Sequence, residues 1–123
     1  MKRDMDLVRV ILLKLAESDN YIKANQLAND KYSRQMVGYH FQILDEAGLI
    51  VASITPAGND PYFFAEAIRL TWEGNDFLDS IRDESIWKRV VSAIVNTTGG
   101  ASLDVIKTLA SSLVFEAINS GLR

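Results

Sequence analysis

Apolar residues near the start of the chain recur at the spacing of an amphipathic helix. Leu7, Ile11 and Leu15 are spaced so that their side chains fall on one helical face. After a polar break at 18–20, the short stretch 24–28 predicts a second helix, which a turn follows. The first part of the chain is therefore predicted to form two helices.

A third helix is predicted to begin after Ser33, a good N-cap residue, and to run to about Ala47, where Gly48 provides a C-terminal stop. The apolar face of this helix consists of Val37, Phe41 and Leu44. Its opposite face consists of Arg34, Gln35, Gly38, Tyr39 and Gln42. A glycine inside a helix costs about 1 kcal/mol relative to alanine. Gly38 therefore indicates a close approach of the helix backbone to DNA or to a neighbouring helix.

The apolar period changes to two after the third helix. Residues 50–55 alternate in the manner of a strand, 56–61 form a cluster of turn residues, and 62–70 predict a return strand. Together they predict a β-hairpin. One core is predicted for these elements and the next helix, made of Leu7, Ile11, Leu15, Leu27, Val37, Phe41, Leu44, Ile68, Leu70 and Phe77.

Three more helices are predicted after the hairpin. Thr71 is expected to cap the fourth, whose inward positions are Trp72, Phe77, Leu78 and Ile81. Either Asp83 or Ser85 is expected to cap the fifth, whose inward positions are Ile86, Val90 and Ile94. A break at 97–100 separates it from a last helix, which runs from Ser102 to about Asn119.

This order of elements predicts a mainly α protein with a small β-hairpin, in the α+β class. A winged helix-turn-helix domain is expected over 1–82, followed by C-terminal helices over 83–123. The run VGYHFQILDEAGLI places a buried helix face, a left-handed exit at Gly48 and the start of a strand in the required order.

Three stretches, MKRDMDLVRVILL, YHFQILDEAGLI and LTWEGNDFLDSIRDESIW, resemble a bacterial and phage family of winged-helix proteins that is labelled only as a domain of unknown function. The resemblance covers essentially the whole chain and implies the fold but no function. The central segment is also similar to winged helix-turn-helix transcriptional regulators. That similarity implies that the third helix, about Ser33 to Ala47, enters the major groove of double-stranded DNA.

The composition, with 48% hydrophobic and 24% charged residues, is that of an ordinary globular protein. The chain has no cysteine and a single histidine, so disulfides and thiolate metal sites are excluded and a zinc site is disfavoured. We therefore expect no metal, no cofactor and a cytoplasmic protein. No stretch has the length of a membrane span, so no membrane partner is expected.

Charge is distributed unevenly, although the net charge is only −3. Residues 44–85 contain nine acidic and two basic residues, whereas residues 21–43 contain three basic residues and one acidic residue. Because phosphate binding requires concentrated positive charge, only the segment around Arg34 is suited to nucleic acid. The predicted wing has no Lys or Arg between Ile50 and Ala67 and so offers no arginine to a minor groove.

The residues expected to bind DNA lie on the third helix and in the turn before it: Lys31, Ser33, Arg34, Gln35, Tyr39 and Gln42. Arg34 can hold a guanine or a phosphate through its planar guanidinium. Lys31 is expected to contact the DNA backbone, with Lys23 as a further phosphate contact. The alternative is a solvated helix face that has no partner.

No arrangement of residues predicts an enzyme. His40 adjoins the apolar Phe41 and has no second histidine or cysteine as co-ligand, which favours a role in the core over catalysis or metal binding. The sequence has no glycine-rich phosphate loop and no Ser/His/Asp order.

The last helix has an apolar seam made of Leu103, Ile106, Ala110, Leu113 and Ala117. The seam predicts a homodimer interface, because many two-fold symmetric DNA readers dimerise through helices outside the reading head. The alternative is that this helix folds back on the first helix as ordinary core. The preferred prediction is a dimeric DNA-binding transcriptional regulator, and the alternative is a winged-helix protein–protein interaction module that does not bind DNA.

Overall fold

The structure is a computed structural model that describes residues 1–97 and 101–121. The chain divides into two compact units, Met1–Asp76 and Phe77–Arg123. The division falls inside the fourth helix, so residues 77–82, which were predicted to belong to the first domain, lie in the second unit. The described residues form helices and a small antiparallel sheet, and the protein is thus of the mixed α and β class.

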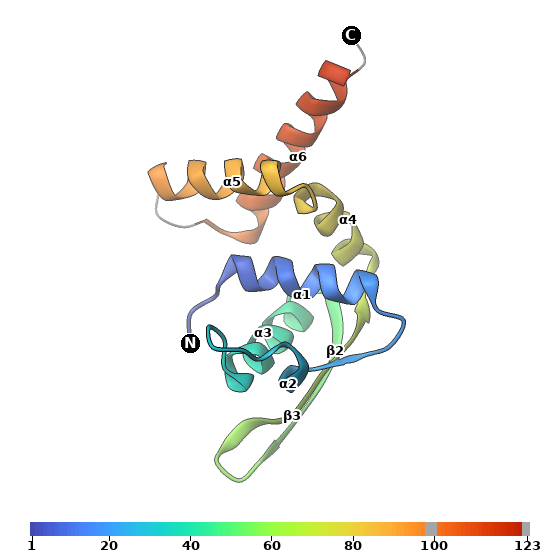
Figure 1. The fold of residues 1–123 in the computed structure, drawn as a ribbon, viewed down its shortest axis with the longest axis vertical. Helices are drawn as coiled ribbons and strands as arrows, with labels where there is room; N and C mark the ends of the chain where they lie inside the picture. Colours follow the sequence, from blue (N-terminus) through green and yellow to red (C-terminus); the bar gives the residue numbers. More distant parts are fainter. Residues whose placement is uncertain (98–100, 122–123) are drawn as a thin grey trace. The chain divides into compact units, whose positions relative to one another are not determined.

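The first unit begins with α1 (Met5–Glu17), β1 (Ile22–Lys23), α2 (Ala24–Leu27) and α3 (Arg34–Glu46). It continues with β2 (Ile50–Ala57), β3 (Asp60–Leu70) and the start of α4 (Trp72–Ile81). The side chain of Asp4 caps α1 by accepting a hydrogen bond from the Leu7 N–H at 3.1 Å. Figure 1 shows the β2–β3 hairpin extending beyond the helices of this unit.

The predicted boundaries of α3 are confirmed. Ser33 caps the helix through its hydroxyl, which accepts a hydrogen bond from the Met36 N–H at 3.1 Å. Gly48 follows the helix with a φ of 77°, a left-handed conformation that glycine adopts without a steric penalty. The chain therefore leaves α3 in the direction that starts β2.

The sheet has three strands in the order β1-β3-β2, not the two of the predicted hairpin. The strand that was missed, β1, is two residues long and pairs Ile22 with Ala67 and Lys23 with Glu66. Two residues are too few for a period-two pattern to appear in the sequence.

The hairpin turn is also shorter than predicted, because Ala57 already pairs with Asp60. A register shift between Thr55 and Ala57 leaves Pro56 opposite no partner residue. A bulge or irregularity of this kind accommodates a proline, which has no N–H for the ladder.

The core of the first unit lies between α1, α3 and the sheet, which contact one another. Most of the predicted core residues of this unit are buried: Leu7, Ile11, Leu15, Val37, Phe41 and Leu44. Phe77, which was predicted to share this core, is buried too but belongs to the second unit. Leu27 and Leu70 are half-buried. The prediction is wrong for Ile68, which is exposed because the register shift next to Ala52 inserts one extra residue into β3 at this position.

Thr71 caps α4 as predicted, since its hydroxyl accepts a hydrogen bond from the Gly74 N–H at 3.0 Å. The inward position predicted for Trp72 is wrong, because this side chain is 80% exposed. Trp72 is the first residue of α4 and precedes the buried turn that contains Phe77, Leu78 and Ile81.

The second unit contains α5 (Glu84–Thr97) and α6 (Leu103–Gly121), which contact each other. Asp83 caps α5 by accepting a hydrogen bond from the Ile86 N–H at 2.9 Å, which decides between the two predicted caps. Ile86 and Val90 are buried and Ile94 is half-buried. Of the predicted break at 97–100, residues 98–100 lie outside the described part. None of the helices over 1–97 and 101–121 combines the length and apolar character of a membrane span.

Candidate functional site

The residues predicted to bind DNA surround the N-terminal end of α3, and three of them are exposed there. Lys31 and Ser33 lie exposed in the loop before the helix, and Gln35 is exposed in its first turn. Tyr39, one turn further along, is half-buried. This end of α3 therefore offers a cation, a hydroxyl, an amide and an aromatic ring to a partner.

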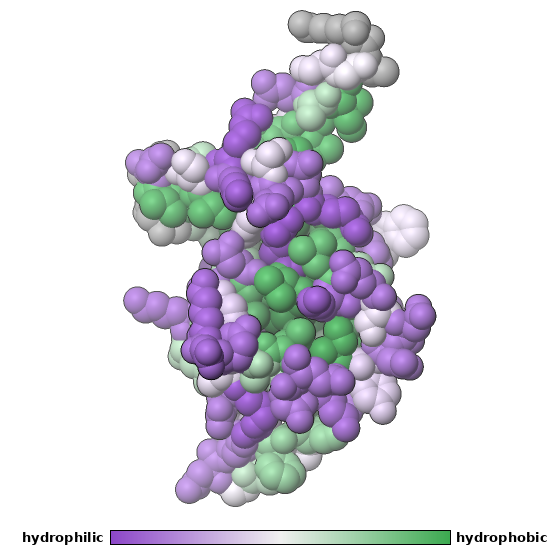
Figure 2. Space-filling view, in the orientation of Figure 1, coloured by the Kyte–Doolittle hydropathy of each residue, from purple (hydrophilic) through white to green (hydrophobic). Residues whose placement is uncertain are grey.

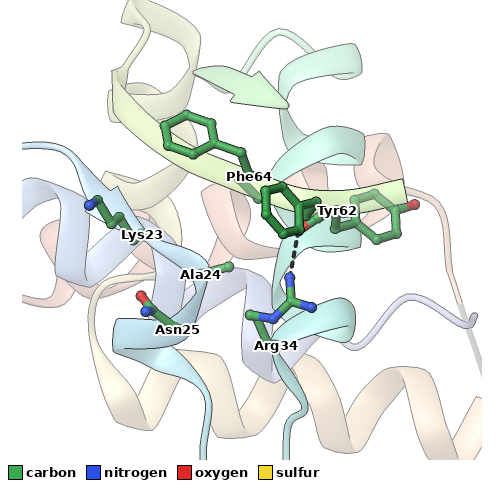
Figure 3. A pocket seen from close by; sticks show the side chains of 8 residues that line it. Lys23, Ala24, Asn25, Arg34, Tyr62 and Phe64 are labelled. Carbon is green, nitrogen blue, oxygen red and sulfur yellow. Dashed lines mark hydrogen bonds between the residues drawn. The ribbon is translucent and has the colours of Figure 1, made fainter. Parts of the chain in front are cut away.

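Arg34 differs from this group, because its guanidinium is held by the hairpin. One terminal nitrogen donates to the carbonyl oxygen of Tyr62 at 2.6 Å, and the other forms an ion pair with Asp60. Figure 3 shows Arg34 directed at β3. The hydrogen bond from Arg34 holds the pKa of the Asp60 carboxyl below its usual value. Arg34 thus links the hairpin to the start of α3, while its side chain is still 32% exposed, and its predicted role in DNA binding stays a prediction.

Tyr62 of β3 packs against the face of α3 that contains Gly38, Tyr39 and Gln42. Its phenol O–H donates to the Gln42 side-chain oxygen at 2.9 Å, and its ring is 6.3 Å from the Tyr39 ring, measured between centroids. A Cβ at Gly38 would be only 2.7 Å from the Cβ of Tyr62. The close approach that Gly38 indicates is therefore made by β3, not by DNA or a second helix.

The six predicted residues therefore separate into two sets. Lys31, Ser33 and Gln35 remain available, with Tyr39 at their border, whereas Arg34 and Gln42 are engaged by β3. Sequence reasoning missed the central role of Tyr62. The one signal for it was the glycine placed one helical turn from both Arg34 and Gln42.

The two ends of α3 differ in charge. Asp45 and Glu46 are exposed at the C-terminal end, where the Asp45 carboxylate accepts a hydrogen bond from the Ala52 N–H at 3.0 Å. Lys31 lies at the N-terminal end with its ammonium 5.3 Å from the centre of the Tyr32 ring. Hydrogen bonding to Tyr32 raises the pKa of Lys31, so this side chain stays charged at neutral pH. The N-terminal end therefore offers one exposed cation, Lys31, which follows the exposed Asp30.

The residues predicted to form a dimer interface also separate into two sets. Ile106 and Ala110 are already buried within the chain and Leu103 is half-buried, and their predicted role at an interface between copies stays a prediction. Leu113 is half-buried and Ala117 is exposed. Phe115 and Ile118 are also exposed in the same half of α6, and Figure 2 shows hydrophobic surface there. The apolar surface that remains open lies in the C-terminal half of the helix.

His40 is fully buried and has two backbone partners. Its Nδ1 lies 2.8 Å from the Met36 carbonyl oxygen, to which it donates, and its Nε2 accepts a hydrogen bond from the Asp4 N–H at 2.9 Å. The ring is therefore neutral and ties α3 to the residue that caps α1. No group of three or more His, Cys, Asp or Glu side chains over residues 1–97 and 101–121 is arranged to hold a metal ion.

We expect the protein to become less stable below pH 6.5 because of His40. Burial lowers the pKa of this histidine from its ordinary value of 6.5. As the pH falls below 6.5, the unfolded chain binds a proton that the folded chain does not, so the free energy of unfolding decreases until the lowered pKa is reached. Each unit of pKa difference corresponds to about 1.4 kcal/mol.

Urea unfolding at about pH 7.5 and about pH 5.5 measures this loss. The His40→Gln variant serves as the control, because it should show a smaller difference between the two conditions. An NMR titration that places the pKa of His40 at or above 6.5 in the folded protein would contradict the expectation.

The chain is similar to proteins that carry no functional description. Residues 2–101 match the model of a family described as hypothetical protein (DUF2513). A Haemophilus influenzae protein, named only as an uncharacterized protein, is 35% identical over 120 residues, which cover 96% of this chain and 99% of the relative. No solved structure matches the chain.

Proposed function

We propose that this chain, which belongs to the DUF2513 family, has a winged-helix fold and binds double-stranded DNA as a transcriptional regulator. The observation that carries the proposal is the element order α1-β1-α2-α3-β2-β3 with the strand order β1-β3-β2. In a winged helix of this order, α3 is the helix that enters the major groove and the β2–β3 hairpin is the wing. The exposed polar residues at the start of α3 support the same assignment.

In this proposal the N-terminal end of α3 faces the DNA. Gln35 can pair with the edge of an adenine, and Tyr39 one turn later can contact the next base or a phosphate. Lys31 and Lys23, both exposed, contact phosphates and fix the register of the helix on the duplex. Arg34 does not read bases but sets the position of the wing through Asp60 and the Tyr62 carbonyl.

The small number of cations supports a dimer as the DNA-binding form. Two lysines for each chain release few counterions from DNA, and a second copy would double the number of contacts. We place the contact between copies on the C-terminal half of α6, where Leu113, Ala117, Phe115 and Ile118 offer an apolar surface. A regulator of this kind works in the cytoplasm, where the bacterial chromosome lies.

The competing candidate is a protein–protein interaction module. It is favoured by the acidic segment 44–85 and by a wing that has exposed phenylalanines and no Lys or Arg between Ile50 and Ala67. The two candidates differ in whether the start of α3 recognises a DNA sequence.

Selection from random-sequence double-stranded DNA at low salt should enrich a defined motif. Replacing Gln35 with Ala should then weaken binding to that motif by about 1–3 kcal/mol and relax the preference at one base pair. Replacing Lys31 with Ala should weaken binding to the motif and to unrelated DNA alike. It should also reduce the slope of log affinity against log salt concentration by about one.

The Lys14→Ala variant is the matched control, because it removes an exposed lysine from α1 and should leave both affinity and salt slope unchanged. If the selection enriches no motif and Lys31→Ala binds DNA as Lys14→Ala does, the interaction module replaces the regulator.

A further inference from the structure

A hollow of about 270 Å³ opens next to Arg34, between the start of α2, the start of α3 and strand β3. It is lined by Lys23, Ala24, Asn25, Arg34, Tyr62, Phe63, Phe64 and Ala65. Figure 3 shows Lys23 and Asn25 on one side of it and Arg34 on the other, with Phe64 on the strand above. Residues from four elements, β1, α2, α3 and β3, thus line one space.

The two phenylalanines of the hollow are exposed next to each other. Phe63 is 64% exposed and Phe64 is 40% exposed, and the wing that carries them has no Lys or Arg between Ile50 and Ala67. An exposed aromatic ring provides a face on which a planar group can stack. The wing therefore offers apolar surface in place of the missing arginine.

The polar residues of the hollow add complementary chemistry. Lys23 is exposed at the rim and can hold a phosphate. Asn25 is also exposed, and its amide can both donate and accept hydrogen bonds at the edge of a base. The negative charge of Asp60 is offset by its ion pair with Arg34. An aromatic face, an amide and an exposed cation together match a nucleobase and its phosphate.

An added peptide strand is the other ligand that this place suggests, because β1 ends after pairing with Glu66 and β3 continues beyond it. Beyond Glu66 the strand becomes irregular, because the register shift between Thr55 and Ala57 leaves residues 61–63 of β3 out of the regular ladder. Arg34 already donates to the Tyr62 carbonyl oxygen, and Asp60 accepts from the Tyr62 N–H at 2.9 Å. The ladder that a peptide strand requires is therefore interrupted.

We propose that this hollow receives an unstacked nucleobase, which stacks on Phe64 with its edge toward Asn25 and its phosphate toward Lys23. The proposal rests on the proposed DNA binding and specifies its substrate: DNA whose bases are unpaired or easily separated. A duplex with a local bubble should accordingly bind more tightly than the fully paired duplex. Stacking of one base on an aromatic side chain accounts for about a five- to hundredfold gain in affinity.

The test compares three DNA probes of one sequence: a paired duplex, the same duplex with a short central bubble, and the single strand. Fluorescence anisotropy with the full chain should show that the bubble binds at least about fivefold more tightly than the duplex. A 2-aminopurine placed in the bubble should lose fluorescence on binding, since stacking on an aromatic ring quenches it.

Phe64→Ala should remove the preference for the bubble and the quenching, while leaving the affinity for the paired duplex unchanged. Phe64→Trp should retain both effects, because it keeps an aromatic face. Trp72→Ala is the matched control, since it removes an exposed aromatic ring that does not line the hollow, and it should behave as the unmodified protein. Circular dichroism confirms that each variant is folded.

Equal affinity for duplex and bubble, or a preference that survives in Phe64→Ala, would overturn the inference while leaving duplex binding as the proposed function. If none of the three probes binds, the proposed function and this inference both fail.

Discussion

Replacing Gly74 with Ala should destabilise the protein by about 3 kcal/mol or more, the largest loss that we expect from one added methyl group. A Cβ at Gly74 would lie only 1.9 Å from the Leu49 carbonyl oxygen. That carbonyl cannot easily move away, because it accepts the Thr71 N–H at 3.0 Å. The Thr71 hydroxyl in turn donates to the Gly48 carbonyl at 2.5 Å. Alanine would improve helix propensity by about 1 kcal/mol, which is too little to offset the overlap.

Urea unfolding followed by circular dichroism measures this loss. Gly121→Ala is the matched control, since nothing lies within 4 Å of a Cβ at this position, and its stability should stay within about 0.5 kcal/mol of the unmodified protein. An unfolding midpoint for Gly74→Ala equal to that of Gly121→Ala would show that the junction between β3 and α4 is not packed as described.

Replacing Leu113 with Glu should convert the proposed dimer to a monomer and weaken the proposed DNA binding at least about tenfold, since the two copies would no longer bind together. Leu113 is half-buried in the C-terminal half of α6, near the exposed Phe115 and Ile118. A carboxylate there would have to lose its water at an apolar contact between copies. Light scattering of the full chain measures the change in mass from that of two chains of 13.7 kDa each to that of a single chain.

Ser112→Glu is the control for the added charge, because Ser112 is exposed beside Leu113 and outside the predicted seam. It should remain a dimer. Phe115→Glu should also give monomers. Because the Phe115 side chain is 66% exposed, this substitution tests the interface between copies without disturbing the contact between α5 and α6. If the unmodified protein is monomeric at high micromolar concentration, the proposed dimer is wrong.

The local features of the fold could be predicted from the sequence, since each depends on a few neighbouring residues. Ser33 and Thr71 cap helices because their hydroxyls accept an N–H three residues ahead. Gly48 ends α3 because only glycine takes a positive φ without strain. The apolar spacing of Leu7, Ile11 and Leu15 identifies the buried face of α1.

Features that depend on pairing between distant residues could not be predicted in this way. The strand β1 is recognisable only through its partners Ala67 and Glu66. Ile68 fits the apolar pattern of β3, and only the register of β2 against β3 turns it outward. The pairing between strands that are distant in sequence therefore accounts for the differences between the observed sheet and the predicted hairpin.

The candidate site shows the same division between sequence and structure. The sequence by itself determined that Gln35 and Tyr39 would share a polar face near the start of α3, because helical periodicity fixes which residues share a face, and that Lys31 would lie in the turn before it. Only the tertiary structure decided that Arg34 and Gln42 would turn to the hairpin, because their partners Asp60 and Tyr62 are twenty or more residues away. The position of a residue in the helical repeat determines the face of the helix on which its side chain lies. The partner of that side chain depends on which strand packs against this face, and only the folded chain places Tyr62 against Gly38.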